Sequence, residues 1–194
     1  MEQNAERLSE LESIDNGKSL IMAKNGDVGS SVNFVRYMAG WATKIMGSTL
    51  DISAPHMPGA EFHAFVKKQP IGVVGAIVPW NFPLSMAIWK IAPALATGCT
   101  VVLKPAEQTS LSALVLAELI IEAGFPAGVV NVVTGYGTEA GSSLVSHSDV
   151  NKITFTGSVE TGKIVGRAAV DQMKRFTLEL GGKSPIIIRE DANI

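Results

Sequence analysis

The spacing of apolar residues predicts two helices in the first third of the chain. One covers residues 5–14 and ends at the Asn16-Gly17 pair, which stops the helical pattern. The other covers residues 28–45, where four apolar side chains recur on one face at helical intervals. The segment 61–68 (EFHAFVKK) instead alternates apolar and polar residues, which predicts a half-exposed strand.

From Ile71 onward, short β-branched runs alternate with helical stretches. The predicted strands cover residues 72–78, 100–103, 129–133, 152–156 and 175–180, and residues 185–189 form a candidate sixth strand. The predicted helices cover residues 84–96, 110–122, 139–146 and 159–170. Strands that alternate with helices of this length are typical of right-handed βαβ units, so we expect an α/β fold with a doubly wound parallel sheet.

Composition narrows the class of protein. The chain has 194 residues, of which 46% are hydrophobic and 18% charged, enough for a sizeable core and indicative of a surface that meets a partner. A net charge of -2 without a Lys/Arg run does not indicate nucleic acid, and no apolar stretch predicts a membrane span. The single cysteine, Cys99, excludes an internal disulfide and predicts a reducing, cytoplasmic location. One cysteine and three scattered histidines do not have the spacing of metal ligands, so no metal site is predicted.

Ligands of open parallel sheets bind at the carboxyl ends of the strands, so the residues after each predicted strand are the candidates for chemistry. Asn81 lies in a turn held by two prolines, where its amide could donate to a developing oxyanion or could satisfy the turn itself. Glu179 lies beside a Gly-Gly pair, where it could act as a general base or remain a solvated strand-end carboxylate.

Two other strand ends carry candidate cofactor ligands. Lys104 and Glu107 could bracket a ribose, or they could form a surface ion pair. Gly157 and Ser158 could bind a phosphate at a helix N-terminus, although Gly-Ser also turns and caps many strand–helix connections. An apolar stripe near the helix 84–96 either packs against the sheet or lines an entry path for an apolar substrate. The stripe consists of Phe82, Met86 and Trp89.

Five stretches in one order resemble the NAD(P)-dependent aldehyde dehydrogenase superfamily. They are RYMAGWATK, QPIGVVGAIVPWNFPLSMAIWKIAPALATGCTVVLKPAEQT, AGFPAGVVNVVTGYG, HSDVNKITFTGS and RFTLELGGKSP, and the match runs from about Phe34 to the C-terminus. Each stretch alone is only suggestive, but five in order are highly specific. The resemblance implies a Rossmann-like NAD-binding domain over residues 71–194. Before it we expect an N-terminal helical segment (1–53) and a connection with one strand of the family's oligomerisation extension (54–70).

The resemblance also implies roles for individual residues. Asn81 matches the oxyanion-stabilising asparagine, and Glu179 matches the general base. Lys104 and Glu107 match contacts to the adenosine ribose, where an acidic residue repels a 2′-phosphate and so favours NAD over NADP. The apolar stripe resembles positions of the substrate tunnel, which would suit hydrophobic or aromatic aldehydes. The remaining expected cofactor contacts are Ile77, Pro79, Trp80, Gly135, Thr156, Gly157, Ser158, Leu180 and Gly181.

The family mechanism uses a cysteine thiolate that attacks the aldehyde, while NAD accepts the hydride and the glutamate activates water. In the family this cysteine follows the ELGGKSP segment, in a separate catalytic domain, and the sequence ends at Ile194. Cys99 enters a predicted strand at the opposite edge of the sheet, so we interpret it as a buried structural thiol. We therefore expect the cofactor-binding part of an aldehyde dehydrogenase, inactive as this isolated chain and homo-oligomeric in the full enzyme.

Two alternatives stay open at this stage. The chain could be a non-catalytic NAD-binding or assembly module that pairs with a separate catalytic polypeptide. It could also be a domain in which NAD binding has been lost, because the adenine pocket needs the full fold to stay rigid.

Overall fold

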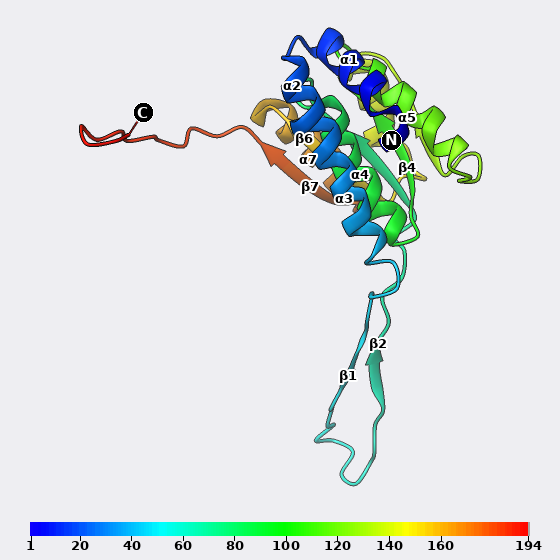
Figure 1. The fold of residues 1–194 in the computed structure, drawn as a ribbon. Coiled ribbons are helices and arrows are strands. Elements are labelled where there is room, and N and C mark those ends of the chain that lie inside the picture. Colours follow the sequence, from blue (N-terminus) through cyan, green and yellow to red (C-terminus); the bar gives the residue numbers. More distant parts are fainter. Residues whose placement is uncertain (194) are drawn as a thin grey trace.

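A five-stranded parallel sheet forms the centre of the protein in the computed structural model, which describes residues 1–193 (Figure 1). The strand order is β5-β4-β3-β6-β7, and every neighbouring pair is parallel. The α/β class and the parallel sheet predicted from the sequence are thus confirmed. The strands are β3 (Val73–Ile77), β4 (Thr100–Lys104), β5 (Val130–Val132), β6 (Lys152–Gly157) and β7 (Arg175–Leu180).

Helices cover both faces of this sheet, which makes it doubly wound. Helices α4 (Pro83–Ala96) and α5 (Leu111–Glu122) share a core with one face. The π-helical turn η3 (Gly137–Gly141), α6 (Ser142–Ser146) and α7 (Val159–Asp171) follow β5 and β6, and α6 and α7 pack on the other face. The winding reverses between β3 and β6. Ligands of such sheets bind at this reversal, outside the carboxyl ends of the strands.

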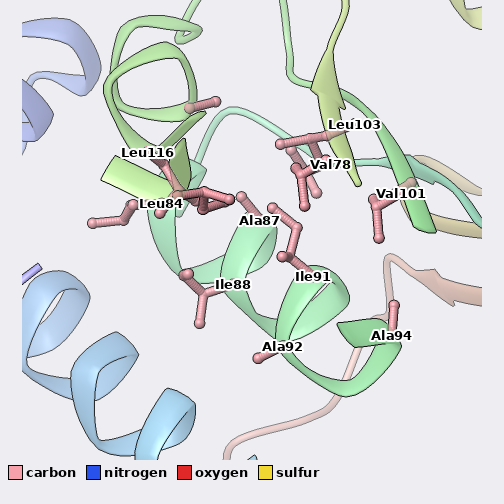
Figure 2. Close-up of a cluster of buried hydrophobic side chains, with 14 of the residues drawn as sticks. Val78, Leu84, Ala87, Ile88, Ile91, Ala92, Ala94, Val101, Leu103 and Leu116 are labelled. Carbon is pink, nitrogen blue, oxygen red and sulfur yellow. The ribbon is translucent and has the colours of Figure 1, made fainter. Parts of the chain in front are cut away.

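Helix α4 buries a row of apolar side chains in the main core (Figure 2). Leu84, Ala87, Ile88 and Ile91 recur at positions i, i+3, i+4 and i+7, and each is at most 3% exposed. Burying a side chain of Leu or Ile size stabilises the fold by about 1.5–3 kcal/mol. Pro83 starts the helix at a position where its missing N–H costs nothing. The turn that precedes α4 therefore stands at a fixed place above β3.

The N-terminal segment folds into helices that pack against α4 and α5. A short 3₁₀ turn, η1 (Glu2–Asn4), leads into α1 (Ala5–Asn16), as the sequence predicts. The second predicted helix, 28–45, has the wrong ends. Ser19 caps a helical run that passes through α2 (Leu20–Met22), the π-helical segment η2 (Ala23–Gly29) and α3 (Ser30–Ala39). It ends there because the chain tightens into i+3 turns after Gly40, with Trp41 N–H donating to the Met38 carbonyl.

A two-stranded antiparallel hairpin projects away from the body (Figure 1). Its second strand, β2 (Ala64–Val66), lies within the predicted strand 61–68. Its first strand, β1 (Ser48–Leu50), was not predicted, since three residues without alternation give no local signal. Gly47 precedes β1 at a point where an added Cβ would collide with the Val66 carbonyl.

The predicted sixth strand at residues 185–189 is wrong. This segment follows β7 as an extended tail that leaves the sheet (Figure 1). Ile186 and Ile187 are 86% and 87% exposed. Their β-branched side chains favour extended backbone, but a strand needs a neighbour to pair with, and none lies beside them within residues 1–193. Among residues 1–193, no helix is long and apolar enough to cross a membrane.

Candidate functional site

A cavity of about 860 Å³ opens at the carboxyl ends of β3, β6 and β7. Asn81, from the turn after β3, and Glu179, from the end of β7, both line it. Met86 and Trp89 of α4 form part of its apolar wall. An amide and a carboxylate therefore share one cavity although they are far apart in sequence.

The turn that carries Asn81 orients its side-chain amide. The Phe82 N–H donates to Asn81 Oδ1 at 3.2 Å, so the side-chain oxygen satisfies the turn, as the simpler interpretation of this residue expects. The Asn81 Nδ2 group makes no hydrogen bond of its own within residues 1–193. Because the oxygen is engaged, the donor end of the amide stays available to a ligand.

Lys90 is a member of this cavity that the sequence analysis missed. Its Nζ donates to Thr154 Oγ1 at 3.0 Å. Burial lowers the pKa of Lys90 from 10.5 to about 8, while the Glu179 carboxylate acts in the opposite direction and Lys152 lowers the pKa further. The available signal was a single charged residue in an otherwise apolar helix, PLSMAIWKIAPALA.

A second cavity, of about 620 Å³, lies on the α7 face of the sheet. Lys104 and Glu107 line it and form an ion pair, with Nζ and Oε2 2.9 Å apart. The Lys104 side chain is only 4% exposed whereas that of Glu107 is 38% exposed. The hydrogen bond from Lys104 lowers the pKa of Glu107. The pair is therefore real, as the simpler interpretation expects, but its ammonium lies inside the wall of a cavity rather than on an open surface.

Helix α7 supplies part of the wall of the second cavity, through residues that were not predicted from the sequence. Thr161, Ile164, Val165 and Ala168 stand at i, i+3, i+4 and i+7 and all line it. Tyr136 lines it from the segment after β5. The helical spacing was the signal that could have found the α7 residues.

The N-terminus of α7 lies where the two cavities approach each other. Ser158 caps this helix by accepting from the Thr161 N–H at 3.1 Å. Gly157 and Ser158 line the first cavity, while Phe155, two residues earlier on β6, lines the second. Unpaired N–H groups at the start of a helix attract anions, so a phosphate group would be favoured between the cavities.

The structure brings most of the predicted site residues to these two cavities. Ile77, Lys104 and Glu107 line the second. Those that line the first are Asn81, Glu179, Pro79, Trp80, Thr156, Gly157, Ser158, Leu180, Gly181, Met86 and Trp89.

Two predicted residues line neither cavity. Gly135 has a φ of 142° that suits glycine, and its successor Tyr136 takes the cavity position. Phe82 lies under Lys18, whose Nζ is 4.3 Å from the ring centroid.

Cys99 lies at the other edge of the sheet. It precedes β4 directly, is 6% exposed, and its Sγ is 3.6 Å from Thr97 Oγ1. It lines a third cavity together with Lys152 and Arg175, the first residues of β6 and β7. Its location agrees with the interpretation as a buried thiol. Within residues 1–193, no group of three or more His, Cys, Asp or Glu side chains could hold a metal ion.

Comparison with known proteins gives one consistent result. The phenylacetaldehyde dehydrogenase of Pseudomonas fluorescens is 56% identical over 193 residues, which are 100% of this chain and 38% of that protein. Aldehyde dehydrogenase 1A1 of Rattus norvegicus is 51% identical, again over 100% of this chain and 38% of its own length. An NAD+ complex of an aldehyde dehydrogenase from Bacillus cereus matches with a TM-score of 0.92 and 53% identity, over 99% of this chain and 38% of that one.

The chain thus spans well under half the length of the relatives it matches. The model of the aldehyde dehydrogenase family matches residues 1–194, and we conclude that the chain belongs to that family.

Proposed function

We propose that residues 1–194 form the NAD-binding part of an enzyme that oxidises an aldehyde to a carboxylic acid. The observation that carries the proposal is the shared cavity of Asn81 and Glu179, which adjoins the cavity of the Lys104–Glu107 pair. The relatives support it, since one acts on phenylacetaldehyde by name and a solved relative is an NAD+ complex.

The two cavities together fit a dinucleotide. The apolar walls from α7 suit an adenine ring, and the exposed part of Glu107 can accept hydrogen bonds from ribose hydroxyls. The α7 N-terminus suits the pyrophosphate, which leaves the nicotinamide end beside Asn81 and Glu179. A carboxylate at the ribose would repel a 2′-phosphate, so the proposal favours NAD over NADP. When bound, the cofactor supplies the hydride acceptor.

The residues of this chain then have distinct tasks around the substrate. Asn81 Nδ2 donates to the aldehyde oxygen as negative charge develops on it. Glu179 takes a proton from the water that hydrolyses the acyl intermediate. Met86 and Trp89 provide an apolar wall for a hydrophobic or aromatic substituent. The nucleophilic thiol of the family comes from elsewhere, because Cys99 lies at the opposite edge of the sheet.

Calorimetry and an activity assay test this proposal. NAD titrated into residues 1–194 should give a saturable signal, and no aldehyde should be oxidised by this chain alone. The same residues exchanged into the Pseudomonas fluorescens enzyme should restore turnover, which Asn81→Ala and Glu179→Gln should each lower. Absence of NAD binding up to millimolar concentration would refute the cofactor assignment. Turnover by residues 1–194 alone would refute the assignment of the nucleophile to another part of the enzyme.

A second candidate function is assembly with further polypeptide, as one subunit of a homo-oligomer or as the partner of a separate catalytic chain. The exposed hairpin favours it, since Phe65 and Leu50 are 66% and 47% exposed. Large apolar side chains on a projecting hairpin are typical of an interface. Sedimentation of residues 1–194 alone measures self-association. Sedimentation with the remainder of the Pseudomonas fluorescens enzyme, supplied separately, measures association with a catalytic chain. A monomer that binds no added chain would refute them.

A further inference from the structure

A buried ion pair lies directly behind the turn that carries Asn81. Lys18 Nζ is 3.0 and 2.9 Å from the two carboxylate oxygens of Asp27. The two side chains are 11% and 0% exposed. Lys18 comes just after α1, and Asp27 lies in the π-helical segment η2, so neither belongs to the sheet or to α4.

The same ammonium group also holds the turn. Lys18 Nζ donates to the Asn81 backbone carbonyl at 2.9 Å, and it stands 4.3 Å above the Phe82 ring. An ammonium has three N–H donors, and here two point to Asp27 and one to Asn81. Asn16, two residues earlier, donates through Nδ2 to the Trp80 carbonyl. Two consecutive carbonyls of the turn are thus tied to the end of α1.

Asp27 is in turn tied to the helix that follows the turn. Ser85 Oγ lies 3.3 Å from the Asp27 carbonyl and 3.4 Å from its Oδ1, and Ser31 Oγ lies 3.4 Å from Ser85 Oγ. The Leu84 N–H donates to Glu12 Oε1 of α1 at 3.1 Å. The turn is therefore fixed at both ends by polar groups of the N-terminal segment.

These contacts determine where the Asn81 amide points. Its backbone carbonyl is held by Lys18 and its side-chain oxygen by the Phe82 N–H, so the backbone and the side chain of Asn81 are both fixed. Within residues 1–193 its Nδ2 group has no acceptor. A catalytic group displaced by about 1 Å can lose about a hundredfold in rate. Buried ion pairs contribute little net stability, because desolvation offsets their attraction. The main effect of the Lys18–Asp27 pair is therefore to fix the position of the turn that carries Asn81.

We infer that Lys18, oriented by Asp27, is a positioning residue that aims the Asn81 amide into the cavity. The inference rests on the proposed function, since it assigns Lys18 a role that acts only through Asn81. A purely structural role would also make Lys18 necessary for a stable fold, but its effect on turnover would then be independent of Asn81.

A double-mutant cycle separates these roles. Residues 1–194 are exchanged into the Pseudomonas fluorescens enzyme, and turnover of phenylacetaldehyde is measured for Lys18→Met, Asn81→Ala and the double variant. Lys18→Met should lower kcat about tenfold to a hundredfold, with the KM for NAD within about twofold. In the Asn81→Ala background the same change should cost less than about threefold. The inference would be overturned if the effects of the two changes on kcat multiply. It would also be overturned if Asn81→Ala lowers kcat and Lys18→Met leaves kcat unchanged. Either result leaves the proposed function standing. An unchanged kcat for Asn81→Ala would overturn the proposed oxyanion role and the inference with it.

Lys174 provides the matched control. It is also a buried lysine whose Nζ donates to backbone carbonyls, those of Val145 and His147 at 2.7 and 2.6 Å. It directly precedes β7, at the edge of the sheet opposite the turn. Lys174→Met should lower stability without lowering kcat at saturating NAD. If Lys18→Met does not fold, the cycle is repeated with Lys18→Arg, which keeps the charge opposite Asp27 but moves the donor that Asn81 requires. Lys18→Arg should lower kcat only where Asn81 is present.

A second measurement uses residues 1–194 by themselves. The side-chain amide of Asn81 should give one sharp pair of ¹⁵N-edited NMR signals. Lys18→Met should broaden or move that pair, and Lys174→Met should leave it in place. An Asn81 signal that is the same in all three proteins would overturn the inference.

Discussion

Glu107→Ala tests the ribose assignment with a magnitude that follows from the structure. The change removes the carboxylate that stands 2.9 Å from Lys104 Nζ and faces the second cavity. A hydrogen bond to a charged group contributes about 1.5–3 kcal/mol. One decade of affinity corresponds to about 1.4 kcal/mol. Loss of the ribose contact should therefore weaken NAD binding about tenfold to a hundredfold.

The same change leaves the Lys104 ammonium without its partner. Breaking a fully buried pair costs about 3–5 kcal/mol. The Glu107 side chain is 38% exposed, so water screens this pair, and we expect a loss in unfolding free energy nearer about 1–2 kcal/mol. For NADP the sign is reversed, because the repulsive carboxylate is gone and the ammonium can pair with a 2′-phosphate. The preference for NAD over NADP should fall.

Calorimetric titration of residues 1–194 with both nucleotides measures the preference, and urea unfolding measures the stability. Glu107→Gln keeps the shape of the side chain and should lie between the wild type and Glu107→Ala. Glu118→Gln is the control, because Glu118 pairs at 3.8 Å with Arg7 on an open surface and should change neither quantity. If NAD affinity and the NADP ratio are both unchanged in Glu107→Ala, the ribose contact does not exist.

Three further predictions concern a lysine, a buried acid and a glycine. Glu179→Gln removes an attraction that raises the pKa of Lys90, so that pKa should fall below about 8; NMR of the labelled amine measures it, and a rise would contradict the geometry. Burial raises the pKa of Glu12, so the native state binds more protons than the unfolded state and stability falls as pH rises from 4.5 through the folded pKa. The unfolding free energy of Glu12→Gln minus that of the wild type, measured in urea, should therefore be more positive at pH 8 than at pH 5. An equal difference at both pH values would refute this. Gly47→Ala should open the hairpin, because its Cβ would collide with the Val66 carbonyl, and hydrogen exchange in β1 and β2 should then accelerate while the sheet stays protected.

The fold could be predicted wherever a segment's own pattern determines its structure. The buried run of β3, VVGAI, and the four-residue inner face of α4 are strong local signals. Strand β1 consists of three residues, all exposed, and it forms because it pairs with β2. The local sequence of neither segment predicts that pairing. The segment 185–189 shows the converse, since its composition favours a strand but no strand among residues 1–193 pairs with it. The helical segment from α2 to α3 begins at the Ser19 cap and ends at i+3 turns after Gly40. The spacing of apolar residues predicts neither end.

A location beside the cavities was predictable for residues at strand ends and not for those that helices supply. Lys104 and Glu179 stand at strand ends, whose location follows from the parallel sheet itself. Lys90 and Ile164 face the cavities only because α4 and α7 pack in particular orientations. Lys18 had no local signal at all, because its partners at Asp27 and Asn81 meet it through tertiary folding.

Cys99, the single thiol of residues 1–194, lies at the edge of the sheet opposite the first two cavities. Cys99 stands just before β4, and Lys104 ends that strand at the edge where the cavities open. A strand rises about 3.3 Å per residue, so the five residues of β4 separate the two edges by about 16 Å. No rotamer of a cysteine covers such a distance, and the sheet between is filled by buried side chains such as Val101 and Leu103. Under the proposed function, Asn81 and Glu179 flank a reacting carbon that Cys99 cannot reach. The proposed chemistry therefore requires a thiol from outside residues 1–194 to enter the first cavity.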